Sequence, residues 1–324
     1  MTTTTTGLLR IGVDLGGTKT EAVAVRLGGP DPEVLARRRI PTARDLGYEH
    51  IVAQTRALVV DVALEAGIDD VARQRIGIGV GMPGSVTRRG ADGSISDVPL
   101  VKNSNTTCLN GRPFRADLAA ALGRTDVAFA NDANCFALAE AVWGAARSAR
   151  VSFGVILGTG VGGGVVLRDE GRVRAWDGAQ SVAGEWGHVV LDPEGGAPCY
   201  CGRRGCIETY LAGPAIERAY AERGGRAGLR LAEIAELAKE GDRIASALIT
   251  ERLEIFGRAL SIIVNVLDPD VIVLGGGVSN LEVLYDDGLK ALRRWVFNDD
   301  LLTRVVKNEL GDSAGVLGAA LLDP

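Results

Sequence analysis

The stretch "LLRIGVDLGGTKTEAVAVRL", residues 8–27, decides the fold. Residues 8–13 have the pattern of a strand, and residues 20–27 alternate in part as a second strand does. Glycine tolerates the backbone angles of a tight turn. The Gly-Gly pair between the two strands therefore predicts a hairpin around "DLGGTK" (14–19).

Strands and helices alternate along the rest of the chain. Strand patterns occur at residues 75–80, 126–130, 151–157, 163–167, 171–176, 270–274 and 303–307. Helical patterns occur at residues 47–66, 114–122, 133–146, most of 213–264, 278–296 and 314–322, whereas 179–210 is rich in loops. The alternation predicts an α/β protein. A length of 324 residues exceeds what one core usually supports, so two domains or lobes are expected.

Charge and composition exclude several classes of function. The net charge of −5 argues against nonspecific nucleic-acid binding and against a polybasic membrane surface. The start "MTTTTTGLLR" has neither the basic nor the apolar region of a secretory signal, and no apolar run is long enough to span a membrane. We therefore expect a cytoplasmic protein in a reducing compartment, where stable disulfides are rare.

Two glycine clusters match the spacing of a dinucleotide-binding fingerprint without its context. "GVGMPG" (79–84) continues into "SVTRRG", and "GTGVGG" (158–163) continues into the β-branched pair of "GGVVL". A dinucleotide site needs a strand, then the glycines, then a helix. Neither cluster opens a helix, so an NAD-dependent oxidoreductase is disfavoured.

The glycines of two turns are candidates for phosphate binding. For any single glycine a tight turn is the commoner explanation. In "DLGGTK", however, the backbone N–H groups, a hydroxyl and the Lys19 ammonium can face phosphates, while the Asp14 carboxylate can hold hydrated Mg²⁺. A second hydroxyl-bearing turn is Gly158-Thr159-Gly160. Two such turns on separate lobes would clamp a nucleotide between them.

"CYCGRRGC" (199–206) holds three of the five cysteines. His188, eleven residues before Cys199, completes a Cys₃His set, which is a common tetrahedral donor set for Zn²⁺. The spacing C-x-C-x₄-C is not that of a zinc finger, so metal binding is favoured but free thiols stay open. A disulfide is disfavoured by strain and by the reducing compartment. Cys108 and Cys135 are expected to be buried apolar residues, and His50 to face solvent on a helix.

The motifs taken together resemble the ROK sugar kinases and regulators of the actin-like/hexokinase superfamily. In the family's order the chain carries "DLGGTK", "GMPG", "NDAN", "LGTGVGGG", "GEWGH", "CYCGRRGCIE" and "LDPDVIVLGGG". These motifs run from residue 11 to the end of the chain. "VKNSNTTCLNG", "PCYCGRRGCIETY" and "LDPDVIVLGGGVSN" are most similar to the bacterial fructokinase/mannokinase branch.

The resemblance implies a two-lobed actin-like ATPase fold of the ribonuclease H-like type, with an interlobe cleft. We expect residues 1–130 to form the N-terminal lobe, 131–310 the C-terminal lobe with the zinc-binding loop, and the helix at about 311–324 to rejoin the first lobe. Zn²⁺ would be structural and held by His188, Cys199, Cys201 and Cys206. ATP and Mg²⁺ are the implied cofactors, with Mg²⁺ held through water by Asp14. The nucleotide-binding residues would be Asp14, Gly16, Gly17, Thr18, Lys19, Gly158, Thr159, Gly160, Gly275, Gly276 and Gly277.

The resemblance also implies a base for phosphoryl transfer. Asp132 follows a strand and stands at a helix start, where a carboxylate is aimed rigidly. Considered alone, Asp132 is more simply an N-cap. In the family pattern it is the catalytic base, and the helix dipole is expected to lower its pKa. Glutamates are more often exposed surface carboxylates, but by family position the sugar-binding residues would be Gly84, Asn105, Asn131, Asp132, Glu185, His188 and Glu208.

The expected activity is ATP-dependent phosphorylation of a sugar 6-hydroxyl. D-Fructose to fructose 6-phosphate is the main expectation, with mannose also accepted. The alternative is an N-acetylhexosamine or glucose kinase, but Leu109 stands where many glucose-type members have tryptophan. A sugar-responsive regulator is disfavoured because only 13 residues precede Asp14, too few for a DNA-binding domain. The partners are therefore a hexose and ATP, without nucleic acid or membrane, and a homodimer is a family expectation.

Overall fold

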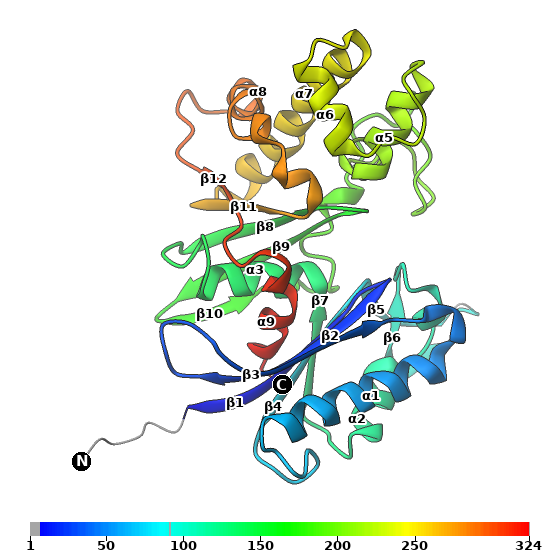
Figure 1. Ribbon diagram of the computed structural model, residues 1–324, viewed down its shortest axis with the longest axis vertical. Coiled ribbons are helices and arrows are strands. Elements are labelled where there is room, and N and C mark those ends of the chain that lie inside the picture. The colour runs from blue at the N-terminus through cyan, green and yellow to red at the C-terminus, as the bar shows by residue number, and fades with distance from the viewer. Residues whose placement is uncertain (1–6, 91, 324) are drawn as a thin grey trace. The chain divides into compact units, whose positions relative to one another are not determined.

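A computed structural model describes residues 7–90 and 92–323 of the chain (Figure 1). The described residues divide into two compact units. Unit 1 comprises Met1–Trp143, Ala175–Val182 and Asp312–Pro324, and unit 2 comprises Gly144–Arg174 and Ala183–Gly311. Among the described residues, no helix combines the length and the apolar composition that a membrane span requires.

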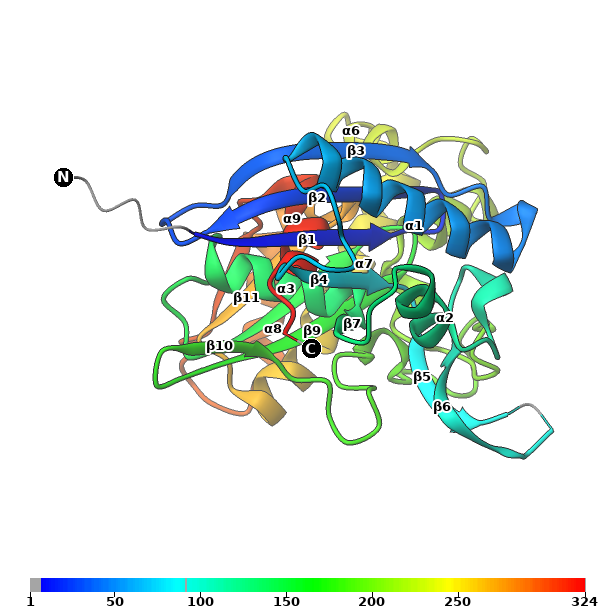
Figure 2. The same cartoon turned by 90° about the horizontal axis from the view of Figure 1, so that it is seen from below.

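Unit 1 is built on a five-stranded sheet of order β3-β2-β1-β4-β7, and Figure 2 shows β3, β2, β1 and β4 side by side. Its strands are β1 (Leu8–Leu15), β2 (Lys19–Leu27), β3 (Glu33–Pro41), β4 (Gly77–Met82) and β7 (Val127–Asn131). The β1–β2 pair is the antiparallel hairpin predicted around "DLGGTK", whereas β1, β4 and β7 run parallel. A separate two-stranded sheet pairs β5 (Ser85–Arg89) with β6 (Ile95–Lys102).

Helices cover both faces of the sheet of unit 1. Alternate residues of β1, such as Ile11 and Val13, join the core beneath α1 (Tyr48–Glu65) and α2 (Phe114–Ala121). The intervening Gly12 faces α9 (Ala314–Ala320), whose backbone leaves no room for a Cβ at that position. α3 (Asp132–Val142) packs against α9 on this second face. The side chain of Asp14, two residues after Gly12, consequently points to the face of α3 and α9.

Unit 2 repeats the strand arrangement of unit 1. Its sheet has the order β10-β9-β8-β11-β12, with β8 antiparallel to β9 and parallel to β11, and β11 parallel to β12. The strands are β8 (Val151–Leu157), β9 (Val161–Asp169), β10 (Arg172–Ala175), β11 (Val271–Gly275) and β12 (Arg304–Lys307). Its helices are α4 (Glu208–Leu211), α5 (Gly213–Glu222), α6 (Leu231–Lys239), α7 (Arg243–Leu267) and α8 (Asp287–Trp295).

Short 3₁₀ turns connect these elements. They are η1 (Arg44–Leu46), η2 (Thr107–Leu109), η3 (Trp186–His188), η4 (Gly277–Asn280), η5 (Glu282–Leu284) and η6 (Gly311–Ser313). The helix predicted over residues 278–296 is wrong in its first half, which forms η4 and η5. There the Ser279 and Asn280 side chains donate to the carbonyls of Gly276 and Gly277. Such local bonds compete with a helix.

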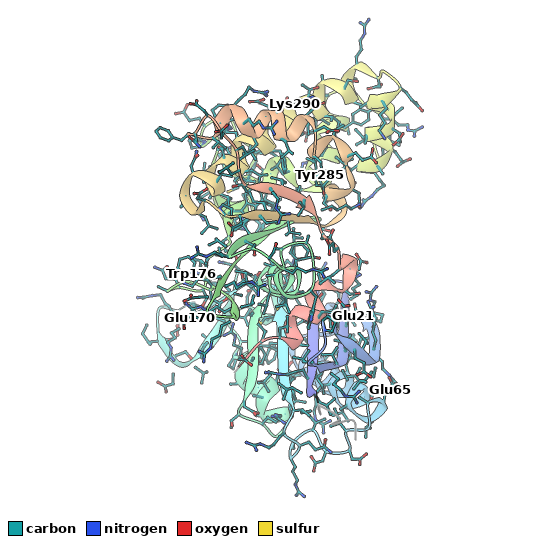
Figure 3. All side chains as sticks on the ribbon, turned by 90° about the vertical axis from the view of Figure 1, so that its left-hand side faces the viewer. Glu21, Glu65, Glu170, Trp176, Tyr285 and Lys290 are labelled. Carbon is teal, nitrogen blue, oxygen red and sulfur yellow. The ribbon has the colours of Figure 1, made fainter. Side chains whose placement is uncertain are left out.

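Three strands escaped prediction. β3 is an edge strand whose sequence "EVLARRRIP" carries three consecutive arginines, and β5 and β6 each have only one fully buried residue. None of the three has the clean alternation that a half-buried strand shows. The buried Glu21 of β2, labelled in Figure 3, pairs with Arg37 and Arg39 of β3 and so explains part of the arginine run.

The division into units differs from the predicted boundary at residue 130/131. Residues 131–143 lie in unit 1, because α3 packs on α9 and the carbonyl of Cys135 lies directly over Gly318. Residues 312–324 also lie in unit 1. The segment 175–182 returns to unit 1, where Asp177 accepts a 2.6 Å hydrogen bond from the buried Asn134 side chain.

Candidate active site and metal centre

The β1–β2 turn holds the predicted phosphate-binding residues of unit 1. Its base is closed by a 3.0 Å hydrogen bond from the N–H of Gly16 to the carbonyl of Lys19. Thr42 donates from its hydroxyl to the carbonyl of Gly16 at 2.7 Å, which ties the turn to the end of β3. Thr18 and Lys19 are exposed, and the Lys19 ammonium lies 3.5 Å from the Asp312 carboxylate. The turn therefore presents a hydroxyl and a cation to solvent.

Asp14 lies at the end of β1 among other carboxylates. Burial, and then the charges of Asp132 and Glu21, raise its pKa to about 7, although Lys19 and Arg39 oppose the rise. A Cβ at position 315 would stand 2.7 Å from a carboxylate oxygen of Asp14, so glycine at this position makes room for the carboxylate. Asp14 and Asp132 thus form a half-buried acidic pair within unit 1, a charge arrangement that a divalent cation neutralises.

Asp132 is the first residue of α3, but Asn131 is the N-cap. The Asn131 side-chain oxygen accepts from the N–H of Ala133 at 2.9 Å, and its amide donates to the carbonyl of Gly84 at 3.0 Å. Asp132 also accepts from the N–H of Ala133 at 2.9 Å. The interpretation of Asp132 as a simple N-cap is therefore wrong, because capping is already supplied by its neighbour.

The predicted lowering of the Asp132 pKa is also wrong. Burial raises its pKa to about 6, and the backbone hydrogen bonds that lower it are too weak to compensate. Desolvation disfavours the charged carboxylate more than the helix start favours it. The carboxylate is still mostly ionised at pH 7, and its proton affinity is higher than that of an exposed aspartate, as suits a general base.

The other predicted sugar contacts of unit 1 lie around the loop after β4. Gly84 has a φ of 89°, and a Cβ there would meet the backbone of Lys102 and Ser104, so no other residue fits without strain. Asn105 is exposed, and its side-chain oxygen would lie 3.5 Å from a Cβ at Gly17 in the β1–β2 turn. Gly84 contacts Asn131, the neighbour of Asp132, and Asn105 lies beside Gly17, three residues after Asp14. These contacts bring the three predicted sugar-binding residues close to the acidic pair.

The β8–β9 turn of unit 2 contacts one predicted sugar-binding glutamate. Glu208, the first residue of α4, accepts from the N–H of Val161 at 2.9 Å. A Cβ at Gly160 would stand only 2.7 Å from the same Glu208 oxygen. The carbonyl of Gly158 accepts from the N–H of Gly213 at the start of α5. The glycines of the β8–β9 turn consequently allow both α4 and α5 to pack closely against this turn.

A cavity of about 830 Å³ opens beside this turn within unit 2. This volume lies within the usual range for a small-molecule site, roughly 300–1,000 Å³. Among the predicted nucleotide-binding residues, Gly158, Thr159 and Gly277 line the cavity, whereas Gly275 is buried in β11 and Gly276 faces Leu157. Sequence reasoning missed the helical part of the lining, which includes Pro214, Glu217, Ala235, Lys239, Ile249 and Leu253.

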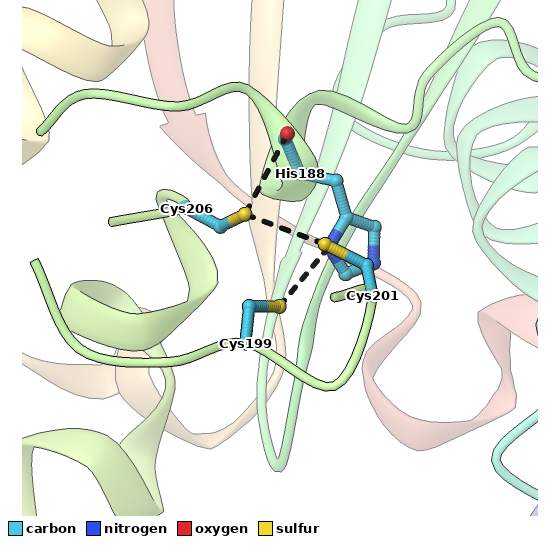
Figure 4. A group of neighbouring side chains, drawn as sticks. All are labelled: His188, Cys199, Cys201 and Cys206. Atoms are coloured by element: carbon cyan, nitrogen blue, oxygen red, sulfur yellow. Dashed lines mark hydrogen bonds between the residues drawn. The ribbon is translucent and has the colours of Figure 1, made fainter. Parts of the chain in front are cut away.

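The predicted zinc ligands come together in unit 2 (Figure 4). The donor atoms of His188, Cys199, Cys201 and Cys206 all lie within 4.8 Å of one another. Cys199 Sγ is 3.6 Å from His188 Nδ1, and the Sγ atoms of Cys201 and Cys206 are 3.6 Å apart. A tetrahedral zinc ion would place such donors about 3.6–3.8 Å apart. The four residues fit the metal, and free thiols would not require this convergence.

The second ring nitrogen of His188 has a partner that the sequence did not reveal. Nε2 lies 2.9 Å from the hydroxyl of Tyr200. The Tyr200 ring packs edge-on against the imidazole. Burial, and then the charges of Glu208 and Glu185, raise the pKa of Tyr200. Both predicted sugar-binding glutamates of unit 2 therefore lie near this phenol.

The burial of two cysteines and one histidine outside these sites was also predicted from the sequence. Cys135 is fully buried as predicted, but Cys108 is only half-buried, because it lies in the η2 turn at the surface of the core. The prediction that His50 faces solvent is wrong. His50 is half-buried, and its Nε2 has no hydrogen-bond partner among the described residues.

The chain is similar to known proteins over nearly its whole length. The model of the ROK family matches residues 10–324. An N-acetyl-D-glucosamine kinase from Photobacterium profundum is 36% identical over 96% of this chain and 98% of its own, and one from Vibrio vulnificus is 34% identical over the same shares.

Solved structures give the same assignment. A ROK hexokinase from Thermus thermophilus is 34% identical with a TM-score of 0.79, covering 98% of each chain. A ROK glucokinase from Streptomyces griseus, in complex with glucose and AMPPNP, is 28% identical with a TM-score of 0.74 and covers 97% of this chain and 99% of its own. The chain belongs to the ROK family, has its two-lobed actin-like fold, and is an ATP-dependent sugar kinase.

Proposed function

We propose that the protein phosphorylates the 6-hydroxyl of N-acetyl-D-glucosamine with ATP. The observation that carries this proposal is the likeness to N-acetyl-D-glucosamine kinases, at 34–36% identity over 96% of the chain. This substrate was the alternative expectation, and the main expectation of fructose has no support among these relatives. The departure at Leu109 was a poor guide to the sugar, because its side chain is completely buried in the core of unit 1.

Asp132 is proposed as the base that receives the proton of the attacking sugar hydroxyl. Phosphoryl transfer depends mainly on positioning and on charge neutralisation, with proton transfer to a placed carboxylate. The start of α3, held by the Asn131 cap and by the bond from Asn131 to Gly84, keeps the Asp132 carboxylate in place. Mg²⁺, when bound through water near Asp14, would neutralise phosphate charge.

The nucleotide is proposed to use the cavity of unit 2 and the β1–β2 turn of unit 1. In unit 2 the apolar lining from α6 and α7, including Ala235 and Leu253, suits a purine, and Gly158 and Thr159 suit phosphates. In unit 1 Gly16, Gly17, Thr18 and Lys19 are proposed to contact phosphates. Gly160 and Gly275 are proposed to shape the site rather than to contact the nucleotide, since neither lines the cavity.

Sugar recognition is proposed to use Gly84, Asn105, Asn131 and Asp132 in unit 1 and Glu185, His188 and Glu208 in unit 2. Carboxylates accept hydrogen bonds from two hydroxyls at once, and they disfavour an analogue that leaves them unpaired. Zn²⁺ is proposed to be held by the Cys₃His set. Because this set leaves no open coordination position, the metal would be structural.

The proposal is tested by steady-state kinetics at saturating Mg-ATP. We expect kcat/KM for N-acetyl-D-glucosamine to exceed that for glucose, mannose and fructose by at least about tenfold, since a site built for a polar group penalises analogues that lack it. The value for N-acetylmannosamine should also be lower, because this 2-epimer carries the same acetamido group in the other configuration. A higher kcat/KM for glucose or fructose would overturn the assignment of the sugar. No phosphorylation of any of the five would overturn the assignment of the substrate class.

The pH dependence of the reaction tests the role of Asp132. A base acts only when it is deprotonated, and the pKa of Asp132 is raised to about 6. With Mg-ATP saturating, kcat/KM for the sugar is therefore expected to be level above pH 7 and to fall about tenfold per pH unit below about 6. An unperturbed aspartate would move this fall to about pH 4. An activity that stays constant down to pH 5 would contradict the raised pKa, and one that stays constant down to about pH 3 would contradict the role as well.

A substitution at Gly160 separates its predicted roles. In Gly160→Ala the added methyl group would press on the Glu208 carboxylate, which must then leave its bond with Val161. We expect KM for the sugar to rise about tenfold while KM for ATP changes little. Gly29→Ala, on an exposed loop of unit 1, is the control. A rise in KM for ATP alone would instead indicate that Gly160 contacts the nucleotide.

A further inference from the structure

Arg44 is a cation beside the β1–β2 turn that the proposed mechanism does not use. It opens η1, shortly after β3 ends, and it is exposed. A Cβ at Gly17 would stand 3.7 Å from Nη1 of Arg44 and 3.5 Å from the side-chain oxygen of Asn105. The same Nη1 donates to the carbonyl of Asn105 at 3.4 Å. Arg44 therefore lies where the proposed phosphate-binding turn meets a proposed sugar-binding residue.

The segment that carries Arg44 is fastened to the β1–β2 turn. The N–H of the buried Thr42 donates to the carbonyl of Thr18 at 2.9 Å, and its hydroxyl donates to the carbonyl of Gly16 at 2.7 Å. Ala43, between Thr42 and Arg44, has a φ of 49° and a ψ of 41°, a left-handed conformation that is uncommon for a residue with a Cβ. Such conformations persist only where the surrounding structure holds them, and they cluster at functional sites. The fold thus holds Arg44 at the turn in spite of backbone strain.

The charge of Arg44 is not paired with a carboxylate among the described residues. By contrast, each arginine at 37–39 in β3 forms an ion pair with a glutamate, and the Lys19 ammonium lies 3.5 Å from Asp312. The guanidinium of Arg44 donates to one backbone carbonyl, which leaves most of its five N–H groups for a ligand. A guanidinium is permanently charged, and its planar fork matches two oxygens of a phosphoryl group at once.

Phosphoryl transfer spreads negative charge over the three outer oxygens of the transferred group, and cations beside them lower the barrier. We propose that Arg44 is a catalytic residue whose guanidinium contacts the phosphoryl group as it passes from ATP to the sugar. In this step the sugar 6-oxygen bonds to the γ-phosphorus, the bond from that phosphorus to the bridging oxygen of ADP breaks, and the hydroxyl proton goes to Asp132. Arg44 stays protonated throughout. The inference rests on the proposed function and adds to it a residue that stabilises the transferred charge.

Arg44→Gln tests the inference, because it removes the charge and keeps a polar side chain. We expect kcat to fall about 10²-fold, as it does when one preorganised donor to a developing charge is removed. KM for the sugar and the melting temperature should change little. Arg44→Lys should recover only part of the loss, because an ammonium restores the charge without the fork. Arg56→Gln, which removes an exposed guanidinium of α1 that donates to the carbonyl of Ala121, is the matched control and should leave kcat unchanged.

A binding measurement separates contact with the phosphoryl group from an effect on the fold. Aluminium fluoride with ADP and the sugar mimics the phosphoryl group during its transfer, whereas ADP alone lacks that group. Arg44→Gln should weaken binding of the aluminium fluoride complex about 10²-fold, since a residue that acts in the transition state is lost most from its analogue. Binding of ADP alone should be unchanged.

Three results would overturn the inference. One is an Arg44→Gln variant that retains more than about a third of the wild-type kcat. Another is a rise in KM for the sugar at unchanged kcat, which would make Arg44 a sugar contact. The third is an equal loss of affinity for ADP with and without aluminium fluoride. All rates use the sugar that the wild-type protein phosphorylates best, so a wrong sugar in the proposed function shows in the wild-type kinetics and leaves the Arg44 comparison intact.

Discussion

Asp132→Asn is expected to lower kcat by about 10²–10⁴-fold, the usual contribution of a general base. Asparagine has the same shape and still accepts a hydrogen bond from the N–H of Ala133, so the start of α3 should keep its geometry. KM for ATP and for the sugar should change by no more than a few-fold. The variant and the wild-type protein are compared by steady-state kinetics at pH 8, where the wild-type carboxylate is ionised.

The control for this variant is Asp97→Asn, which removes an exposed carboxylate from β6 in the same unit. It should leave kcat unchanged. The residual activity of Asp132→Asn should also lose the fall below pH about 6 that is predicted for the wild-type protein. If Asp132→Asn retained more than about a tenth of the wild-type kcat, a positioned general base would not be needed, and the assignment of Asp132 would be wrong.

Loss of the proposed zinc ion is the second change with a large expected effect. Cys201→Ser, or treatment with a strong chelator, should lower the melting temperature by on the order of 5–10 °C, since metal binding contributes directly to folding. KM for the sugar should rise by about 10–100-fold, because Glu185 and Glu208 flank the ligands in sequence and Glu208 lies two residues past Cys206. Elemental analysis of the purified protein should find one zinc per chain.

Cys108→Ser is the matched control for the metal centre, because Cys108 is a half-buried thiol in unit 1 that lies far along the chain from the four ligands. It should retain both zinc and sugar affinity. Adding Zn²⁺ to the chelated wild-type protein should restore the KM, whereas Cys201→Ser should respond weakly. Full activity in a preparation that contains no metal would contradict the structural role of zinc.

The local parts of the fold were predictable because their causes are local. The Gly-Gly pair and the alternation on either side of it predict the β1–β2 hairpin, and the observed register runs unbroken from Leu8 to Leu15. The Asn131 side chain caps the start of α3 through a local hydrogen bond with the N–H of Ala133. The edge strand β3 could not be predicted, since its arginines are explained by a buried Glu21 on a different strand.

The ligands of the proposed metal site could likewise be predicted from the sequence. A Cys₃His set is rare enough to be noticed, and its members lie within 19 residues of one another, from His188 to Cys206. The hydrogen-bond partner of the second ring nitrogen of His188 could not be predicted from the sequence. Tyr200 contacts His188 only because the loop folds back upon itself, and no spacing rule signals this contact.

By itself, the sequence determined the residue types of the candidate site: two aspartates, the glycine turns, an asparagine beside the proposed base and the four proposed metal ligands. Only the tertiary structure decided what those residues experience. Burial raises the pKa of Asp132, although backbone hydrogen bonds at the helix start lower it. Glycine is needed at position 160 because the Glu208 carboxylate lies where a Cβ would stand. The cavity beside Gly158 is completed by helices that follow residue 213. The physical reason is that residue types and turns depend on neighbours along the chain. Desolvation, close approach and cavity shape depend on atoms that only folding brings together.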